Sequence, residues 1–132
     1  MAVVLDSSEI NRALKRIAHE IIERNKGIEN LVLIGIPTRG SLLSARLAKV
    51  IGELEGQTIE HGTLDTTMYR DDLRGSAPRS LGKTEIPASG VHEREVVLVD
   101  DVLFSGRTIR AALDAIAEHG RPRSVQLAVL ID

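Results

Sequence analysis

Cysteine and tryptophan are absent from this 132-residue sequence, and it has one phenylalanine and one tyrosine. Without cysteine there is neither a disulfide framework nor a thiolate zinc site, which suits a reducing cytoplasm. Tyr69 and Phe104 are too few to build the platform of aromatic rings on which single-stranded nucleic acids stack. The four histidines lack the spacing of metal ligands. These absences argue against a protein-held zinc centre and against recognition of bases by stacking.

Long hydrophobic runs and an excess of basic charge are also absent. No apolar run reaches the roughly 20 residues that a membrane-spanning helix needs, and the opening MAVVLDSSEI lacks the pattern of a secretory signal. The net charge of −2 means that any contact with nucleic acid must rest on a local basic patch. With 42% apolar residues, the chain can bury one core. We expect a single cytoplasmic domain, residues 1–132, without a membrane partner.

Segments with helical and extended patterns alternate along the chain. Helices are predicted at Ser7–Lys26, where Asp6 and Glu9 resemble a capping box, and at Leu42–Leu54 and Gly106–His119. Short apolar runs predict buried strands at Leu31–Ile36 and Glu95–Val99, and we expect further strands within Gln57–Asp65 and at Ser124–Ile131. This alternation predicts an α/β fold with an open parallel sheet flanked by helices.

A long segment between the second and third predicted strands has no sustained periodicity. It runs from about residue 66 to residue 94 and contains Pro78, Pro87 and three glycines. Structureless loops of this length are uncommon in compact domains and are usually lids or disordered segments. We expect a lid.

Two polar motifs follow the first and third predicted strands. They are Pro37-Thr38-Arg39-Gly40 and the run from Asp100 to Thr108. In open parallel sheets, ligands bind beyond the carboxyl ends of strands, where the strand order reverses. We therefore expect the first and third strands to lie side by side, with both motifs at one edge of the sheet.

The second motif has the chemistry of a phosphate site beside a sugar site. Backbone amides at the start of the following helix can bind an anion, while Ser105 and Thr108 add hydroxyl donors and Gly106 permits close approach. Asp100 and Asp101 would repel phosphate, so they suit ribose hydroxyls or a sugar cation. The pattern favours a phosphorylated sugar as ligand.

Two other site types match the sequence less well. Receiver domains of response regulators also carry acidic residues at a strand end, but at the end of the first strand, whereas these follow the third. The run from Gly35 to Ser41 has the glycine spacing of a nucleoside triphosphate P-loop but lacks the lysine that the P-loop requires. Neither alternative explains the Phe104 to Thr108 turn.

The residues Val96–Thr108, VVLVDDVLFSGRT, resemble the phosphoribosyl pyrophosphate signature of type I phosphoribosyltransferases. The helix Ile10–Ile22, the turn Gly35–Gly40 and the run Tyr69–Leu73 narrow the resemblance to the bacterial pyrimidine operon regulator and uracil phosphoribosyltransferase family. The similarity covers nearly the whole chain.

The resemblance implies a role for each candidate site residue. Asp100 and Asp101 would hold the ribose hydroxyls, and Arg70 in the lid would close over the departing pyrophosphate. The residues that would wrap the 5′-phosphate are Phe104, Ser105, Gly106, Arg107 and Thr108, and those that would bind pyrophosphate are Thr38, Arg39 and Gly40. Mg2+ would arrive with phosphoribosyl pyrophosphate (PRPP) and not on direct protein ligands. The implied reaction converts uracil and PRPP to uridine monophosphate (UMP) and pyrophosphate, through positioning and electrostatic stabilisation.

The first predicted helix suggests a second kind of function. Opposite its apolar stripe lie Arg12, Lys15, Arg16 and His19 within one arc. A charged helix face is usually only a solvated face. Here the family resemblance implies binding to the leader RNA of pyrimidine operons, with attenuation that responds to uridine nucleotides, and assembly into dimers or tetramers.

Two alternatives stay open, namely transfer to another base and a nucleotide-binding module without activity. Members of the family continue past the strand ending at Asp132 into a segment that helps to form a hood over the base. With this hood region missing, we expect binding of PRPP to be retained and transfer to uracil to be weak. An uncovered edge at Val125–Ile131 would favour self-association.

Overall fold

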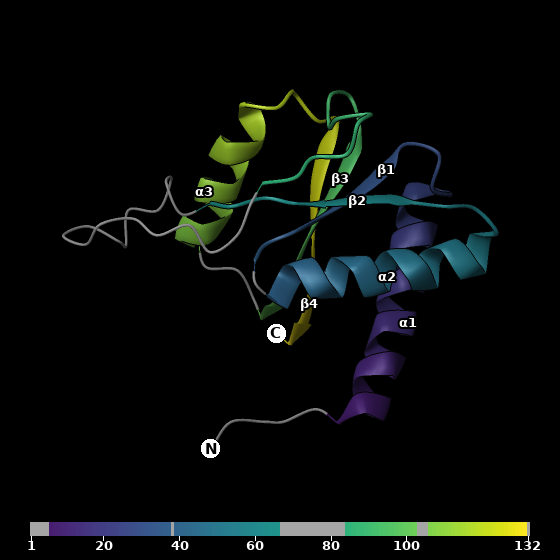
Figure 1. The fold of residues 1–132 in the computed structure, drawn as a ribbon. Coiled ribbons are helices and arrows are strands. Elements are labelled where there is room, and N and C mark those ends of the chain that lie inside the picture. Colours follow the sequence, from purple (N-terminus) through teal and green to yellow (C-terminus); the bar gives the residue numbers. More distant parts are fainter. Residues whose placement is uncertain (1–5, 38, 67–83, 103–105, 132) are drawn as a thin grey trace, which may run out of the picture.

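The computed structural model describes residues 6–37, 39–66, 84–102 and 106–131, with the backbone alone at 101–102, 106–108 and 131. It is a parallel four-stranded sheet in the order β2-β1-β3-β4 with three helices (Figure 1). In chain order the elements are α1 (Ser7–Asn25), β1 (Leu31–Gly35), α2 (Arg39–Glu55), β2 (Glu60–Thr63), β3 (Glu95–Val102), α3 (Gly106–Ala117) and β4 (Ser124–Ile131). The predicted α/β class is confirmed.

The predicted elements are all present, and two of them are longer than expected. α2 begins at Arg39, three residues before the predicted Leu42, and β3 continues to Val102 instead of ending at Val99. In both places polar or small side chains interrupt the apolar pattern, while the backbone hydrogen bonding continues through them. Val102 still pairs with Ile131 of β4. The adjacency of β1 and β3, inferred from the two motifs, is confirmed.

The return from the predicted lid is anchored to the sheet. Glu85 forms an antiparallel bridge with Thr63 at the end of β2, with N···O distances of 3.0 and 2.8 Å. Val91 is fully buried, and Ile86 packs against the core. Residues 67–83, including Arg70, lie outside the described part of the chain.

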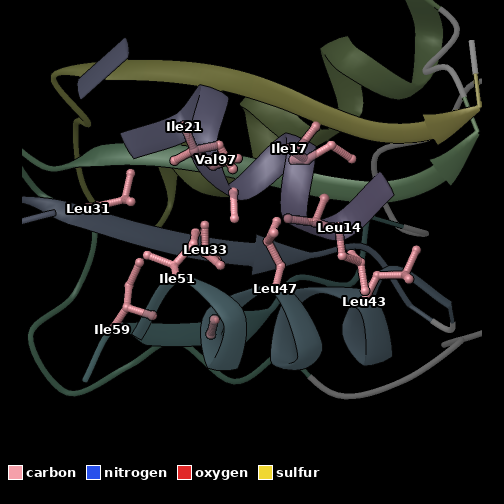
Figure 2. Packing of buried hydrophobic residues seen from close by; sticks show 14 of the residues in the cluster. Leu14, Ile17, Ile21, Leu31, Leu33, Leu43, Leu47, Ile51, Ile59 and Val97 are labelled. Atoms are coloured by element: carbon pink, nitrogen blue, oxygen red, sulfur yellow. The ribbon is translucent and has the colours of Figure 1, made fainter. Parts of the chain in front are cut away.

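Helices cover both faces of the sheet. Figure 2 shows the side on which the apolar stripes of α1 and α2 meet β1. The labelled side chains in this cluster are Leu14, Ile17, Ile21, Leu31, Leu33, Leu43, Leu47, Ile51, Ile59 and Val97. On the opposite face, Ala112, Ala115 and Ile116 of α3 pack over the alternate residues of β1 and β3. Each large aliphatic side chain buried in this way contributes about 1.5 to 3 kcal/mol.

The predicted capping box at the start of α1 is present. The Asp6 carboxylate accepts a hydrogen bond from the Glu9 amide at 2.8 Å, and the Asp6 amide donates to Glu9 Oε1 at 3.3 Å. The bond from the Glu9 amide, together with the Ser8 hydroxyl, lowers the pKa of Asp6. None of the described helices has the length and apolarity needed to cross a membrane.

Arg94 joins the amino ends of β1 and β2. Its side chain is 14% exposed, and it donates to the carbonyls of Asn30 (3.2 Å) and Leu31 (2.8 Å) and to Glu60 Oε1 (3.1 Å). The Ser89 hydroxyl bonds to both Arg94 and Glu60. The pKa of Glu60 is lowered, first by the Ser89 hydroxyl and then by Arg94, while burial acts in the opposite direction.

Replacing Arg94 by lysine should destabilise the fold by roughly 1 to 3 kcal/mol, because a lysine cannot make the forked set of bonds to Leu31, Asn30 and Glu60. Urea unfolding measures the effect. The control is Arg123→Lys, whose exposed arginine lies 3.9 Å from Glu95, and for which we expect a change within about 0.5 kcal/mol. Equal effects of the two substitutions would show that Arg94 is not a structural anchor.

Candidate functional site

The two polar motifs meet at the carboxyl edge of the sheet. Gly35, the last residue of β1, lies opposite Val99 of β3, and the Ile36 amide donates to the Val99 carbonyl at 3.0 Å. The chain after β1 enters α2, and the chain after β3 enters α3. The chain after Gly35 of β1 and the chain after Val102 of β3 therefore leave the sheet from neighbouring strands.

Two glycines let α2 sit directly on the backbone of this edge. A Cβ atom added to Gly40 would lie 2.3 Å from the Val99 carbonyl oxygen and 3.4 Å from the Asp100 Cα. A Cβ atom on Gly35 would lie 2.2 Å from the Gly40 carbonyl oxygen. Distances this short exclude a side chain at either position unless the backbone moves. Gly35 had no individual role among the sequence-based predictions, although a lone glycine inside an apolar strand is a known sign of close backbone approach.

The starts of α2 and α3 form an environment that favours anions. Both helices begin at the carboxyl edge, and neither has an acidic residue in its first turn. By contrast, α1 has Glu9 in its first turn and is capped by Asp6. The first amides of a helix and its dipole favour negative charge. The positive ends of α2 and α3 are thus not neutralised by acidic side chains of their own first turns.

Polar side chains surround the start of α2. Asp100, half-buried, pairs with Val129 near the end of β3. Ser41 has a buried hydroxyl with no hydrogen-bond partner among the described residues, whereas the Ser44 hydroxyl donates to the Ser41 carbonyl at 2.9 Å. An unpaired buried hydroxyl costs about 1 to 3 kcal/mol. Such a cost at this edge is consistent with a site that a ligand or water completes.

The end of β2 closes one side of this edge. The Leu64 amide donates to the Gly35 carbonyl at 3.0 Å, and the Asp65 amide donates to the Thr84 hydroxyl at 2.9 Å. Thr66 is buried. These bonds hold the residues on either side of segment 67–83 beside β1. The Thr84 contact was not predicted from the sequence, because the residues around it carry no apolar periodicity.

Comparison with known proteins assigns the chain to a family. The phosphoribosyl transferase domain family matches residues 3–132. The bifunctional protein PyrR of Streptomyces coelicolor is 60% identical over 129 residues, which are 98% of this chain and 67% of that protein. The PyrR of Geobacter sulfurreducens is 56% identical over 131 residues, covering 98% of this chain and 73% of that protein. The chain belongs to the PyrR family.

Solved phosphoribosyltransferases share the fold of this PyrR family member. A purine phosphoribosyltransferase from Pyrococcus horikoshii superposes with a TM-score of 0.68 at 23% identity, over 96% of this chain and 74% of that one. A hypoxanthine-guanine phosphoribosyltransferase from Bacillus anthracis gives 0.71 at 16% identity, over 98% and 71%. At these identities the likeness shows the fold alone.

The sequence-predicted site residues of this PyrR chain are described to different extents. Arg39 is the exposed first residue of α2, and Gly40 is buried behind it. The backbone places Asp101 in β3 and makes Gly106, Arg107 and Thr108 the first turn of α3. The predicted residues outside the described part of the chain are Thr38, Arg70, Phe104 and Ser105. Among the described residues, no three carboxylate or histidine side chains lie together as a metal site.

The predicted basic face of α1 is exposed to solvent. All four of its residues, Arg12, Lys15, Arg16 and His19, are exposed, and the opposite stripe is buried. Arg16 lies 3.1 Å from Glu20, one turn further along the helix. This ion pair reduces the charge that Arg16 presents to a partner.

We expect Gly40→Ala to lower the free energy of unfolding by about 1 to 3 kcal/mol, because the new methyl group collides with the Val99 carbonyl. The neighbouring change Ser41→Ala should leave stability unchanged or raise it by up to about 1 kcal/mol, since it removes an unpaired hydroxyl. Chemical denaturation of both variants measures this contrast. If Gly40→Ala were as stable as the parent, the close contact between the first turn of α2 and the Val99 carbonyl would be disproved.

Proposed function

We propose that this chain transfers the phosphoribosyl group of PRPP to uracil, forming UMP and pyrophosphate, and that it binds pyrimidine-operon leader RNA in response to uridine nucleotides. The observation that carries the proposal is the meeting of the two motifs at one sheet edge, in a chain of the PyrR family. The enzyme class follows from the family, since the whole chain matches a phosphoribosyl transferase domain.

The shape of PRPP suits this edge. PRPP carries a phosphate group at one end of the ribose and a pyrophosphate at the other. The starts of α2 and α3 offer two separate positive helix ends, each following one of two adjacent strands. We assign pyrophosphate to the turn Thr38-Arg39-Gly40 and the 5′-phosphate to residues 104–108 (Phe104, Ser105, Gly106, Arg107 and Thr108).

Between the two helix starts, the acidic end of β3 suits the sugar. Asp100 follows the buried residue Val99 and is itself half-buried, so its carboxylate is partly shielded from water. Asp100 and Asp101 would accept hydrogen bonds from the ribose hydroxyls. Their negative charge also favours positive charge on the sugar as the bond from C1′ to pyrophosphate breaks and the bond to the uracil nitrogen forms.

The leaving group is pyrophosphate. We propose that the turn at residues 38–40 and Arg70 contact it and stabilise its negative charge. Mg2+ prefers oxygen ligands, which the substrate PRPP supplies, so we propose no direct protein ligand for it. When bound with PRPP, Mg2+ would neutralise charge on the pyrophosphate. The chain's own part is to hold the sugar, the 5′-phosphate and the pyrophosphate in place, so that C1′ faces the uracil nitrogen.

The RNA half of the proposal rests on the exposed basic face of α1. Arg12 and Lys15 have no carboxylate at ion-pair distance among the described residues, so their charges are open to a phosphate backbone. Arg16 and His19 flank them. We also propose a dimer or tetramer, supported by the apolar surface that half-exposed Leu127 offers on the edge strand β4.

Asp100→Asn and Asp101→Asn should each lower kcat/KM for UMP formation by about 10²- to 10³-fold, by analogy with the loss of other groups that stabilise transition-state charge. Thermal stability should change far less than turnover, because both residues lie at the carboxyl end of β3. The control is Asp114→Asn, an exposed carboxylate on α3, which should leave the rate unchanged. Large stability losses with normal turnover would give the two aspartates a structural role. Turnover with another base and not with uracil would disprove the proposed substrate.

Replacing both Arg12 and Arg16 by alanine should weaken binding to a pyrimidine leader hairpin. The slope of log affinity against log salt concentration should become shallower by about 0.7 for each phosphate that is no longer neutralised. Filter binding across a range of salt concentrations measures the slope. The double variant Arg121→Ala, Arg123→Ala removes the same charge from exposed positions before β4 and should keep the slope of the parent. If both double variants behaved alike, α1 would not be part of the RNA surface.

A further inference from the structure

An arginine of α2 lies at the border of the basic face of α1. Arg46 Nη2 donates a hydrogen bond to Asn11 Oδ1 of α1 at 2.8 Å, and both side chains are exposed. This bond crosses the seam between the two helices, whose apolar stripes pack together beneath it (Figure 2). Arg46 therefore joins a surface that the sequence pattern of α1 alone could not reveal.

Helical geometry places other cations beside this contact. Lys15 follows Asn11 by four residues and so lies next to it on the same side of α1. Arg12 is the neighbour of Asn11 along the chain, in the middle of the exposed face. Arg46 and Lys15 thus lie beside Asn11, and Arg12 lies further round the same exposed side of α1.

The positive charges on this surface are not neutralised within the described part of the chain. No carboxylate there lies within ion-pair distance of Arg46, Lys15 or Arg12, in contrast to Arg16, which pairs with Glu20. Asn11 is uncharged, so it orients the guanidinium of Arg46 without cancelling its charge. Four further N–H donors of a guanidinium bonded in this way remain for a planar fork contact with a phosphate.

We infer that Arg46, held by Asn11, contacts a phosphate of the bound RNA, so that the RNA surface crosses from α1 onto α2. This inference rests on the proposed RNA binding. A membrane surface fits less well, because peripheral helices insert an apolar face, and the apolar stripe of α1 is buried against α2 and the sheet. Several cations on one surface of two packed helices match the repeating phosphates of a nucleic acid.

The test compares Arg46→Gln with Lys49→Gln in salt titrations of binding to a pyrimidine leader hairpin. Lys49 is an exposed lysine of the same helix, but it lines a groove toward β2 with Gly52 and His61. Arg46→Gln should reduce the log-salt slope by roughly 0.7 to 0.9 and weaken binding about fivefold to tenfold near 0.1 M salt. Lys49→Gln should match the parent.

Two further variants separate the effect of the charge of Arg46 from the effect of its position. Arg46→Lys keeps the charge and should retain most of the parent's slope on log salt. Asn11→Ala frees the guanidinium and should weaken RNA binding less than Arg46→Gln does. Thermal unfolding midpoints should stay at the parent value, because both side chains are exposed.

The outcomes distinguish this inference from the proposed function. If Arg12 and Arg16 substitutions weaken RNA binding but Arg46→Gln does not, the inference is wrong and the proposed function stands. If the parent chain binds no leader RNA, both the proposed regulation and this inference are wrong. Arg46-dependent binding to phosphatidylglycerol vesicles as tight as that to the hairpin would also overturn the assignment to RNA.

Discussion

The close seating of the first turn of α2 on the backbones of β1 and β3 is the constraint on which the candidate site depends. At Gly35 and Gly40 there is no space for a side chain, and the Val99 carbonyl lies directly beneath. The start of α2 is thereby held beside Asp100 with no intervening side chains. A helix that stood even one methyl group further from the sheet would separate the proposed pyrophosphate turn from the proposed ribose carboxylates.

The same helix links the two proposed functions. Its start lies at the proposed nucleotide edge, and Arg46, seven residues after Arg39, lies at the seam with α1. Leu43 lies between these points and Leu47 follows Arg46, and both pack in the same buried cluster as the apolar stripe of α1. Because protein interiors are close-packed, α2 and α1 have little freedom to shift independently. The proposed substrate site and RNA surface therefore share one rigid element.

Stabilising contacts and the proposed ligand site lie at opposite edges of the sheet. At the amino edge, Arg94 satisfies carbonyls from two residues and the carboxylate of Glu60. At the carboxyl edge, the Ser41 hydroxyl has no partner in the part of the chain that the structure describes, and two helix starts carry no acidic residue in their first turns. The core and the amino edge supply stability, which allows the proposed ligand site at the carboxyl edge to hold polar groups without partners there.

The sequence by itself determined the fold class, the three helices and three of the strands, because hydrophobic patterning is a local signal, while β2, Glu60–Thr63, has few apolar residues and was placed only within Gln57–Asp65. β4 has the predicted bounds, Ser124–Ile131, since its apolar run coincides with its backbone pairing. The run through Asp100 and Asp101 could not be assigned to β3, because strand pairing uses backbone groups that continue beneath polar side chains. Only the tertiary structure decided the contacts between distant residues, such as Glu85 with Thr63, Arg94 with Leu31 and Arg46 with Asn11. Such contacts depend on how the elements pack, and single polar residues carry no period from which packing could be inferred.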